Sequence, residues 1–218
     1  MRIQLRITAN HKPVPFDHQA ILTGALHKWL GENEEHNSIS LYSFSSLTGG
    51  KLKQNQLDFS RGTSLTISAW DNRIIGKIID GIRQDNHIAY GMRVREIILV
   101  ETPDLSEQEL FYLASPVFIK RTVGNRDVHI VYTEEDAGNY LKETLTNKLK
   151  TAGIEHVEFE IEFDKTYRKA KTKLITYRDI KNRASICPVI IRGDKIVKEF
   201  AWHVGIGNST GIGFGALK

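Results

Sequence analysis

The sequence has one cysteine, Cys187, among its 218 residues. A single cysteine allows neither an internal disulfide nor a C-x-x-C metal pair, so we expect Cys187 to be a small buried apolar residue. No stretch approaches the about 20 apolar residues of a membrane span, and the opening MRIQLRITAN lacks the apolar run of a signal peptide. These absences predict a soluble cytoplasmic protein with no membrane partner.

The motifs of common cofactor sites are also missing. No H-E-x-x-H pair occurs, and no Gly-Lys-Ser or Gly-Lys-Thr follows a glycine loop as in a P-loop. The glycines near the C-terminus do not form the dinucleotide pattern G-x-G-x-x-G, because the sixth position counted from Gly205 is Thr210. We therefore expect no metal site and no cofactor.

Hydrophobic residues make up 40% of the chain, which is enough for sizeable cores. The polarity alternates over residues 2–8 as in a strand, and apolar residues at helical spacing predict helices over about 17–30 and 72–83. Further strands are expected at 41–47, 56–60, 64–70 and 92–101. The predicted order is a strand, a helix, a group of strands, a second helix and a last strand.

A comparable order begins again after the turn-like residues 102–108. Strands are expected at 111–121 and 127–133, a helix at 134–150, and mostly β-structure in the rest, including 195–207. Two such units predict an α+β protein with tandem ferredoxin-like (RRM-like) domains, residues 1–104 and residues 105–218.

Positive charge is concentrated in one stretch, although the net charge is only +4. Between Lys165 and Arg183 there are eight Lys or Arg residues, and Asp179 is the only acid. Such a run can bind RNA phosphates, and Tyr167 and Tyr177 offer stacking surfaces. A solvated hairpin is an equally good interpretation of the charge alone.

Five of the last fourteen residues are glycine, in GIGNSTGIGFGALK. Glycine suits positive φ angles or close approach to the backbone, and the interleaved Ile206, Ile212 and Phe214 argue against a frayed end. We interpret this stretch as the end of a strand that runs into a working glycine loop.

The spacing Gly205-Ile206-Gly207, five residues, Gly213-Phe214-Gly215 resembles the C-terminal glycine loop of the CRISPR-associated repeat-processing endoribonucleases. These enzymes belong to the repeat-associated mysterious protein superfamily. The N-terminal strand, HQAILTGALHKWL, ENEEHNSIS, LYSFSSL and SPVFIK resemble other parts of that family, so the resemblance covers nearly the whole chain. It implies an enzyme that cuts precursor CRISPR RNA within its repeats, without metal, to leave a 2′,3′-cyclic phosphate and a 5′-hydroxyl.

The resemblance implies His36 as the catalytic histidine. In related enzymes a tyrosine or histidine near the position of His27 can join the active site, so His27 is either the partner of His36 or a residue of the polar face of its helix. Two histidines can act as base and acid because their ordinary pKa lies near working pH. The family often has a lysine shortly after the catalytic histidine; this sequence departs from that pattern, and Lys51 and Lys53 are the nearest candidates. Tyr42 is expected to serve packing.

RNA binding is expected from three groups of residues, with CRISPR repeat RNA as the partner. They are Lys120 and Arg121; Arg168, Lys169, Lys171, Lys173, Arg178, Lys181 and Arg183; and, through exposed N–H groups, Gly205, Gly207, Gly211, Gly213 and Gly215. Further CRISPR effector subunits and a homodimer are compatible with the resemblance. Two alternatives stay open: a non-catalytic RNA-binding subunit of an effector complex, and a general binder of single-stranded RNA.

Overall fold

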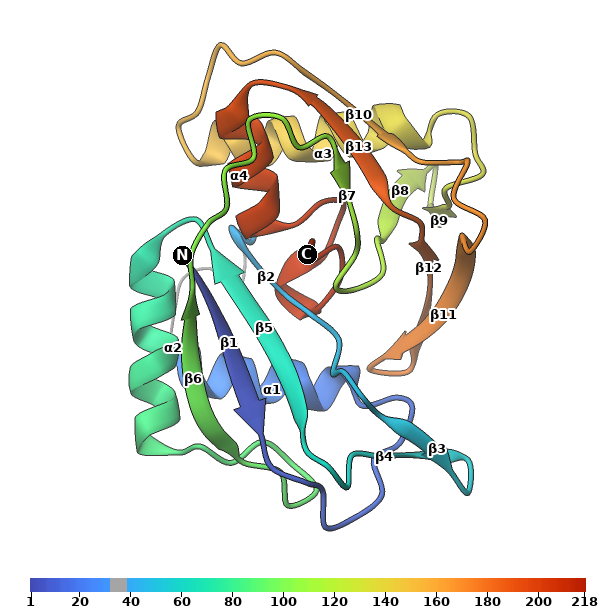
Figure 1. Cartoon of the computed structure of the whole chain (residues 1–218). Coiled ribbons are helices and arrows are strands. Elements are labelled where there is room, and N and C mark those ends of the chain that lie inside the picture. The colour runs from blue at the N-terminus through green and yellow to red at the C-terminus, as the bar shows by residue number, and fades with distance from the viewer. Residues whose placement is uncertain (32–38) are drawn as a thin grey trace.

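A computed structural model describes residues 1–31 and 39–218 of the chain (Figure 1). The predicted catalytic residue His36 therefore lies outside the described residues. The first unit of the fold contains β1 (Arg2–Ile7), α1 (Gln19–Leu30), β2 (Tyr42–Phe44), β3 (Lys51–Lys53), β4 (Gln56–Asp58), β5 (Thr63–Ala69), α2 (Asn72–Gln84) and β6 (Val94–Val100).

Four strands of the first unit form an antiparallel sheet in the order β2-β5-β1-β6. This is the strand order of a ferredoxin-like fold, with β3 and β4 added as a separate hairpin. The alternation in β1 buries Ile3, Leu5 and Ile7, and they pack in one core with apolar residues of α1 and α2. The predicted strands and helices of this unit are confirmed, apart from the β3 strand, which the sequence did not indicate.

The second unit begins at β7 and contains one three-stranded sheet, two separate hairpins and two α-helices. Its elements are β7 (Leu110–Phe111), β8 (Ile119–Val123), β9 (Arg126–Ile130), α3 (Ala137–Thr151), β10 (Phe159–Phe163), β11 (Lys171–Tyr177), β12 (Ile180–Ile186), β13 (Val189–Gly193), α4 (Lys195–Val204) and the 3-10 turn η2 (Thr210–Ile212).

The sheet of the second unit has the order β10-β13-β7. Its fourth place is taken by the last residues of the chain, since Leu113 and Leu217 form an antiparallel bridge and the Lys218 N–H donates to the Tyr112 carbonyl at 2.9 Å. The resulting order repeats that of the first unit, so the fold is a tandem pair of ferredoxin-like units. The division between residues 104 and 105 stays a prediction.

The prediction of a strand over residues 195–207 is wrong, because Lys195–Val204 form the helix α4. Val197, Phe200, Ala201 and Val204 are all fully buried and lie at helical spacing, a period that the short apolar run conceals. The long strand expected over 111–121 is also interrupted: β7 ends at Phe111 and β8 begins at Ile119, with Pro116 between them.

The two units are joined by α4 and the C-terminal residues, which lie near the middle of Figure 1. Trp70 at the end of β5 packs edge-on against Phe200 of α4, with ring centroids 5.1 Å apart. The buried guanidinium of Arg2, in β1, donates to the carbonyls of Trp202 and Leu217. Burial lowers the pKa of Arg2 to about 9, because the surroundings disfavour its charge.

Candidate nucleic-acid interface and active site

Residues 205–215, here called the glycine segment, connect α4 to the last residues of the chain, which form an edge of the second sheet. Six of its N–H groups have acceptors within the protein, at 2.7–3.1 Å: Gly205 donates to Ala201, Ile206 to Gly215, Asn208 to Phe118, Ile212 to Ser209, Gly213 to Thr210 and Gly215 to Pro116. The expectation that the segment follows a strand is wrong, because it follows the helix α4. The expectation that it exposes its N–H groups is wrong for the groups that have these acceptors. Contact of its five glycines with RNA stays a prediction.

Two glycines of this segment are required by close approach to the first unit. Gly213 has a φ of 90°, and a Cβ there would overlap Gln19 Nε2 and lie 2.7 Å from the Phe44 ring. A Cβ on Gly211 would overlap Ser40 Oγ and lie 3.0 Å from Tyr42 Oη. The glycines thus allow the C-terminal segment to pack directly on α1, β2 and the residues before β2.

His27, in the last turn of α1, lies beside this packed segment. Its Nε2 is 3.5 Å from Tyr42 Oη, and that hydroxyl donates to the Gly211 carbonyl at 3.4 Å. His27 is half-buried and Tyr42 is 4% exposed. The structure therefore brings together a predicted catalytic histidine, a tyrosine that the sequence assigned to packing, and a predicted RNA-binding glycine.

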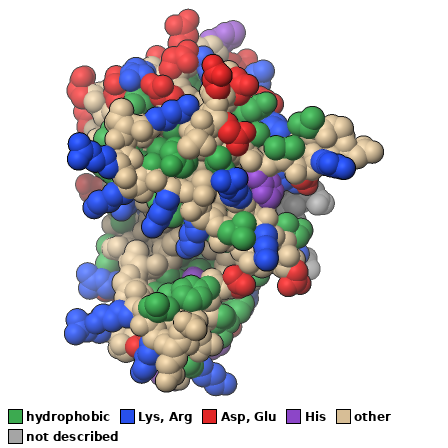
Figure 2. Space-filling model, turned by 90° about the vertical axis from the view of Figure 1, so that its right-hand side faces the viewer, with side chains coloured by type: hydrophobic (Ala, Val, Ile, Leu, Met, Phe, Trp, Pro, Cys, Tyr) green, Lys and Arg blue, Asp and Glu red, His purple; other side chains and the backbone are tan. Residues whose placement is uncertain are grey.

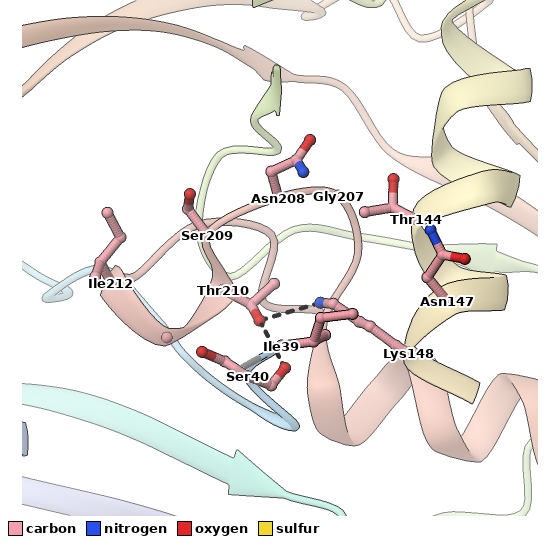
Figure 3. A pocket seen from close by; sticks show the side chains of 11 residues that line it. Ile39, Ser40, Thr144, Asn147, Lys148, Gly207, Asn208, Ser209, Thr210 and Ile212 are labelled. Atoms are coloured by element: carbon pink, nitrogen blue, oxygen red, sulfur yellow. Dashed lines mark hydrogen bonds between the residues drawn. The ribbon is translucent and has the colours of Figure 1, made fainter. Parts of the chain in front are cut away.

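A cavity of about 400 Å³ is partly lined by the glycine segment. Ser40, residues Thr144, Asn147 and Lys148 of α3, and Asn208–Ile212 contribute to its wall (Figure 3). Lys148 is 3% exposed, and its Nζ donates to the carbonyls of Val204 and Gly205 and to Thr210 Oγ at 3.4, 3.2 and 3.1 Å. Burial lowers the pKa of Lys148 to about 7.

Sequence reasoning missed Lys148, although a signal was present. The apolar stripe of α3 includes Leu141, Leu145 and Leu149, and Lys148 follows Leu141 by seven residues, which places it on the same face. A lysine in an apolar stripe requires buried acceptors. Their identity is not encoded locally, because Thr210 lies 62 residues further along the chain.

Lys51, the third predicted catalytic residue, is not brought to His27. It is the exposed first residue of β3, opposite Asp58, in a hairpin that projects away from the glycine segment (Figure 1). Lys53 ends the same strand. Neither lysine supplies the described part of the site with a cation.

Lys120 and Arg121, in β8, do lie beside the glycine segment. The Lys120 N–H donates to Asn208 Oδ1 at 2.9 Å, and Arg121 Nη1 lies 3.3 Å from the same oxygen. Arg121 also pairs with Glu143 at 2.9 Å, and Lys120 pairs with Asp127 at 3.0 Å. RNA phosphates would therefore compete with these acidic side chains for the two cations.

The basic run forms an exposed hairpin and the loop before it. Arg168 and Lys169 are exposed in that loop, and Arg178 occupies the turn between β11 and β12. The register places Lys171 and Lys173 on one face of the hairpin and Lys181 and Arg183 on the other, because Lys173 faces Ala184 and Leu174 faces Arg183. The sequence could not show that the run is divided in this way.

The side of the molecule that carries the hairpins β8–β9 and β11–β12 is unevenly charged. Lys and Arg are spread over the middle and lower parts of this face, whereas most Asp and Glu gather at its upper end (Figure 2). Such a distribution favours binding of a polyanion to the lower and middle parts.

Neither a metal-binding cluster nor a membrane-spanning helix occurs in the described part of the chain. Among residues 1–31 and 39–218, no three His, Cys, Asp or Glu side chains gather where they could hold a metal ion. Within the same residues, no helix is long and apolar enough to cross a membrane. Metal independence of any reaction stays a prediction.

Comparison with protein families gives a match over more than half of the chain. The model described as "CRISPR associated protein Cas6, C-terminal" matches residues 100–218. The chain belongs to this Cas6 family. A search of curated proteins finds no significant match. The predicted family resemblance is thus confirmed.

Three solved structures are similar to this Cas6-family chain at 20% identity, and each comparison covers 100% of it. They are described as "CRISPR associated protein Cas6" (TM-score 0.85, 98% of that chain), "Characterization of a Cas6-related gene from Pyrococcus furiosus" (0.86, 97%) and "An RAMP protein binding different RNA substrates" (0.87, 98%). At this identity they confirm the tandem ferredoxin-like fold.

Proposed function

We propose that this protein is an endoribonuclease that cleaves precursor CRISPR RNA within its repeats and needs no metal ion. The observation that carries the proposal is that Tyr42 Oη contacts both His27 Nε2 and the Gly211 carbonyl, so a histidine lies near the segment at which the two units meet. Membership of the Cas6 family supports it, as does the similarity to a structure described as a Cas6 product complex (TM-score 0.65, 12% identity).

The proposed reaction uses the nucleophile that RNA itself carries. One histidine removes the proton of the 2′-hydroxyl, the 2′-oxygen attacks the neighbouring phosphorus, and the bond to the 5′-oxygen breaks. The second histidine gives a proton to the departing 5′-oxygen. The products are a 2′,3′-cyclic phosphate and a 5′-hydroxyl, with His36 and His27 in the two acid–base roles.

RNA binding in this proposal rests on charge outside the acid–base site. The exposed cations of β11 and β12, together with Lys120 and Arg121 next to Asn208, would hold phosphates of the RNA strand. Within the glycine segment, the Gly211 carbonyl accepts a hydrogen bond from Tyr42.

A second candidate is a non-catalytic RNA-binding subunit. Two observations favour it: the structure places Lys51 away from His27, and the basic hairpin can bind RNA without any acid–base group. A similar structure is itself described only as a protein binding different RNA substrates.

Labelled repeat RNA, incubated with the purified protein in EDTA, distinguishes the two candidates. The set comprises wild type, His36→Ala, the exposed-histidine control His11→Ala, and a substrate with 2′-deoxyribose at the cleaved nucleotide. The enzyme proposal expects cleavage by wild type and His11→Ala, none by His36→Ala and none of the deoxy substrate, with RNA binding retained throughout. Binding without cleavage by wild type would favour the subunit.

A further inference from the structure

The buried amine of Lys148 organises the part of the glycine segment that touches Tyr42. In its charged form the amine has three hydrogens, which match the three acceptors within reach, two backbone carbonyls and Thr210 Oγ. A charged amine in an apolar helix stripe is costly unless each hydrogen is bonded, so these contacts favour one position of residues 204–210 over others.

Thr210 connects Lys148 with the first unit of the fold through hydrogen bonds. Its hydroxyl accepts from Lys148 and donates to the Ser40 carbonyl at 3.5 Å, as the two dashed lines in Figure 3 show. Thr210 is 1% exposed, so this hydroxyl lies almost entirely within the protein. One hydroxyl thus connects α3 of the second unit with the residues that lead into β2.

The next residue after Thr210 makes the contact that matters for chemistry. The carbonyl of Gly211 accepts from Tyr42 Oη, and Tyr42 Oη lies 3.5 Å from His27 Nε2. A displacement of Thr210 therefore displaces the Gly211 carbonyl, and with it the hydroxyl beside His27. Misplacement of a reacting group by about 1 Å can lower a rate about 100-fold.

We propose that Lys148 and Thr210 are positioning residues for cleavage: they hold Gly211 and Ser40 so that Tyr42 orients His27. This inference rests on the proposed endoribonuclease function. Neither residue touches the reacting atoms, so their loss lowers the rate of the chemical step and leaves RNA affinity unchanged.

The test compares four variants in single-turnover cleavage of labelled repeat RNA, with affinity and Tm measured in parallel. Thr210→Val removes the hydroxyl and keeps the shape, whereas Thr210→Ser keeps the hydroxyl. Lys148→Met removes the amine. Thr144→Val is the matched control, because Thr144 lines the same cavity but, within residues 1–31 and 39–218, its hydroxyl bonds only to the Tyr140 carbonyl in its own helix.

We expect Thr210→Val and Lys148→Met each to lower the cleavage rate constant at least tenfold, with the Kd for RNA within threefold of wild type. Thr210→Ser and Thr144→Val should cleave within threefold of wild type. A fifth protein, with Thr210→Val and Lys148→Met combined, should be no slower than the slower of these two single variants, because the two groups act as one unit.

Thr210→Val that is folded and cleaves at the wild-type rate would overturn the inference while the endoribonuclease function stands. An equal loss in Thr210→Ser would also overturn it, since a packing effect would then explain both. If Lys148→Met does not fold, the two Thr210 variants decide alone. A wild-type protein that binds but does not cleave overturns both proposals.

Discussion

Two segments that the sequence predicts to bind RNA, the glycine segment and the basic run, lie in opposite surroundings. The glycine segment is largely buried, and six of its N–H groups have acceptors inside the protein. The cations of the β11–β12 hairpin and its loop are exposed. The glycine segment therefore acts through its close packing and the basic run through its charge, although the sequence predicts RNA binding for both.

This difference separates two contributions to the proposed activity. Substitution in the glycine segment should disturb folding and the rate of cleavage, because the segment holds the two units and Tyr42 together. Substitution in the basic run should weaken RNA binding, reduce its salt dependence and leave the cleavage step unchanged. Variants of both segments can test that division.

Gly213→Ala should lower the free energy of unfolding by about 3 kcal/mol, from overpacking and a left-handed backbone together. The added Cβ would meet Gln19 and the Phe44 ring. Urea denaturation measures the effect. Gly124→Ala is the control, since Gly124 has a positive φ of 61° and no atom near its Cβ; it should cost only about 1 kcal/mol. Equal losses in both would show that the packing of Gly213 is unimportant.

His27→Ala should slow cleavage about 100-fold or more, which is typical of the loss of a general acid or base. Tyr42→Phe should have a smaller effect in the same direction, because it removes only the hydroxyl near His27. Single-turnover rates with saturating protein measure both, and His11→Ala serves as the control. Cleavage by His27→Ala at the wild-type rate would remove His27 from the site.

Lys148 should make stability depend on pH in alkaline solution. Its pKa is lowered from 10.5 to about 7, so between these values the unfolded chain binds a proton that the folded protein does not. The free energy of unfolding of wild type, relative to Lys148→Met, should therefore rise from pH 7 towards pH 10.5, by at most about 1.4 kcal/mol per pH unit.

Denaturation series at pH 6, 7, 8 and 9 provide the measurement. Lys142→Met, at an exposed position of the same helix, provides the baseline. A difference between wild type and Lys148→Met that is flat, or that falls with pH, would contradict the burial of the amine.

Neutralising Lys181 and Arg183 together should weaken RNA binding several-fold at moderate salt. For each phosphate that the variant no longer neutralises, the slope of log K against log salt should become shallower by about 0.7. Titrations at three salt concentrations measure this, with Lys77→Gln and Arg83→Gln combined, both on the exposed side of α2, as the charge-matched control. An unchanged slope would place the bound RNA elsewhere, and Lys171 with Lys173, on the opposite face, would be tested next.

Much of the first unit was predictable because local patterns and burial agree there. The alternation of Ile3, Leu5 and Ile7 and the helical spacing of Ile74, Ile75 and Ile78 match the faces that the structure buries. In the second unit, the sequence predicted a strand where α4 lies. All buried residues of α4 fall within ten positions, and so short a run is compatible both with the helical period and with the alternation of a strand. Short apolar runs do not distinguish a helix from a strand.

The tandem order of elements, the family resemblance, the glycine spacing and the concentration of positive charge could all be found in the amino-acid sequence. The packing of the glycines against Gln19, Phe44 and Ser40, and the position of Tyr42 beside His27, became visible only in three dimensions. The same holds for the buried amine of Lys148, whose partner Thr210 is 62 residues away. These features depend on contacts between distant segments, and a local pattern of polarity does not encode which distant backbone will approach.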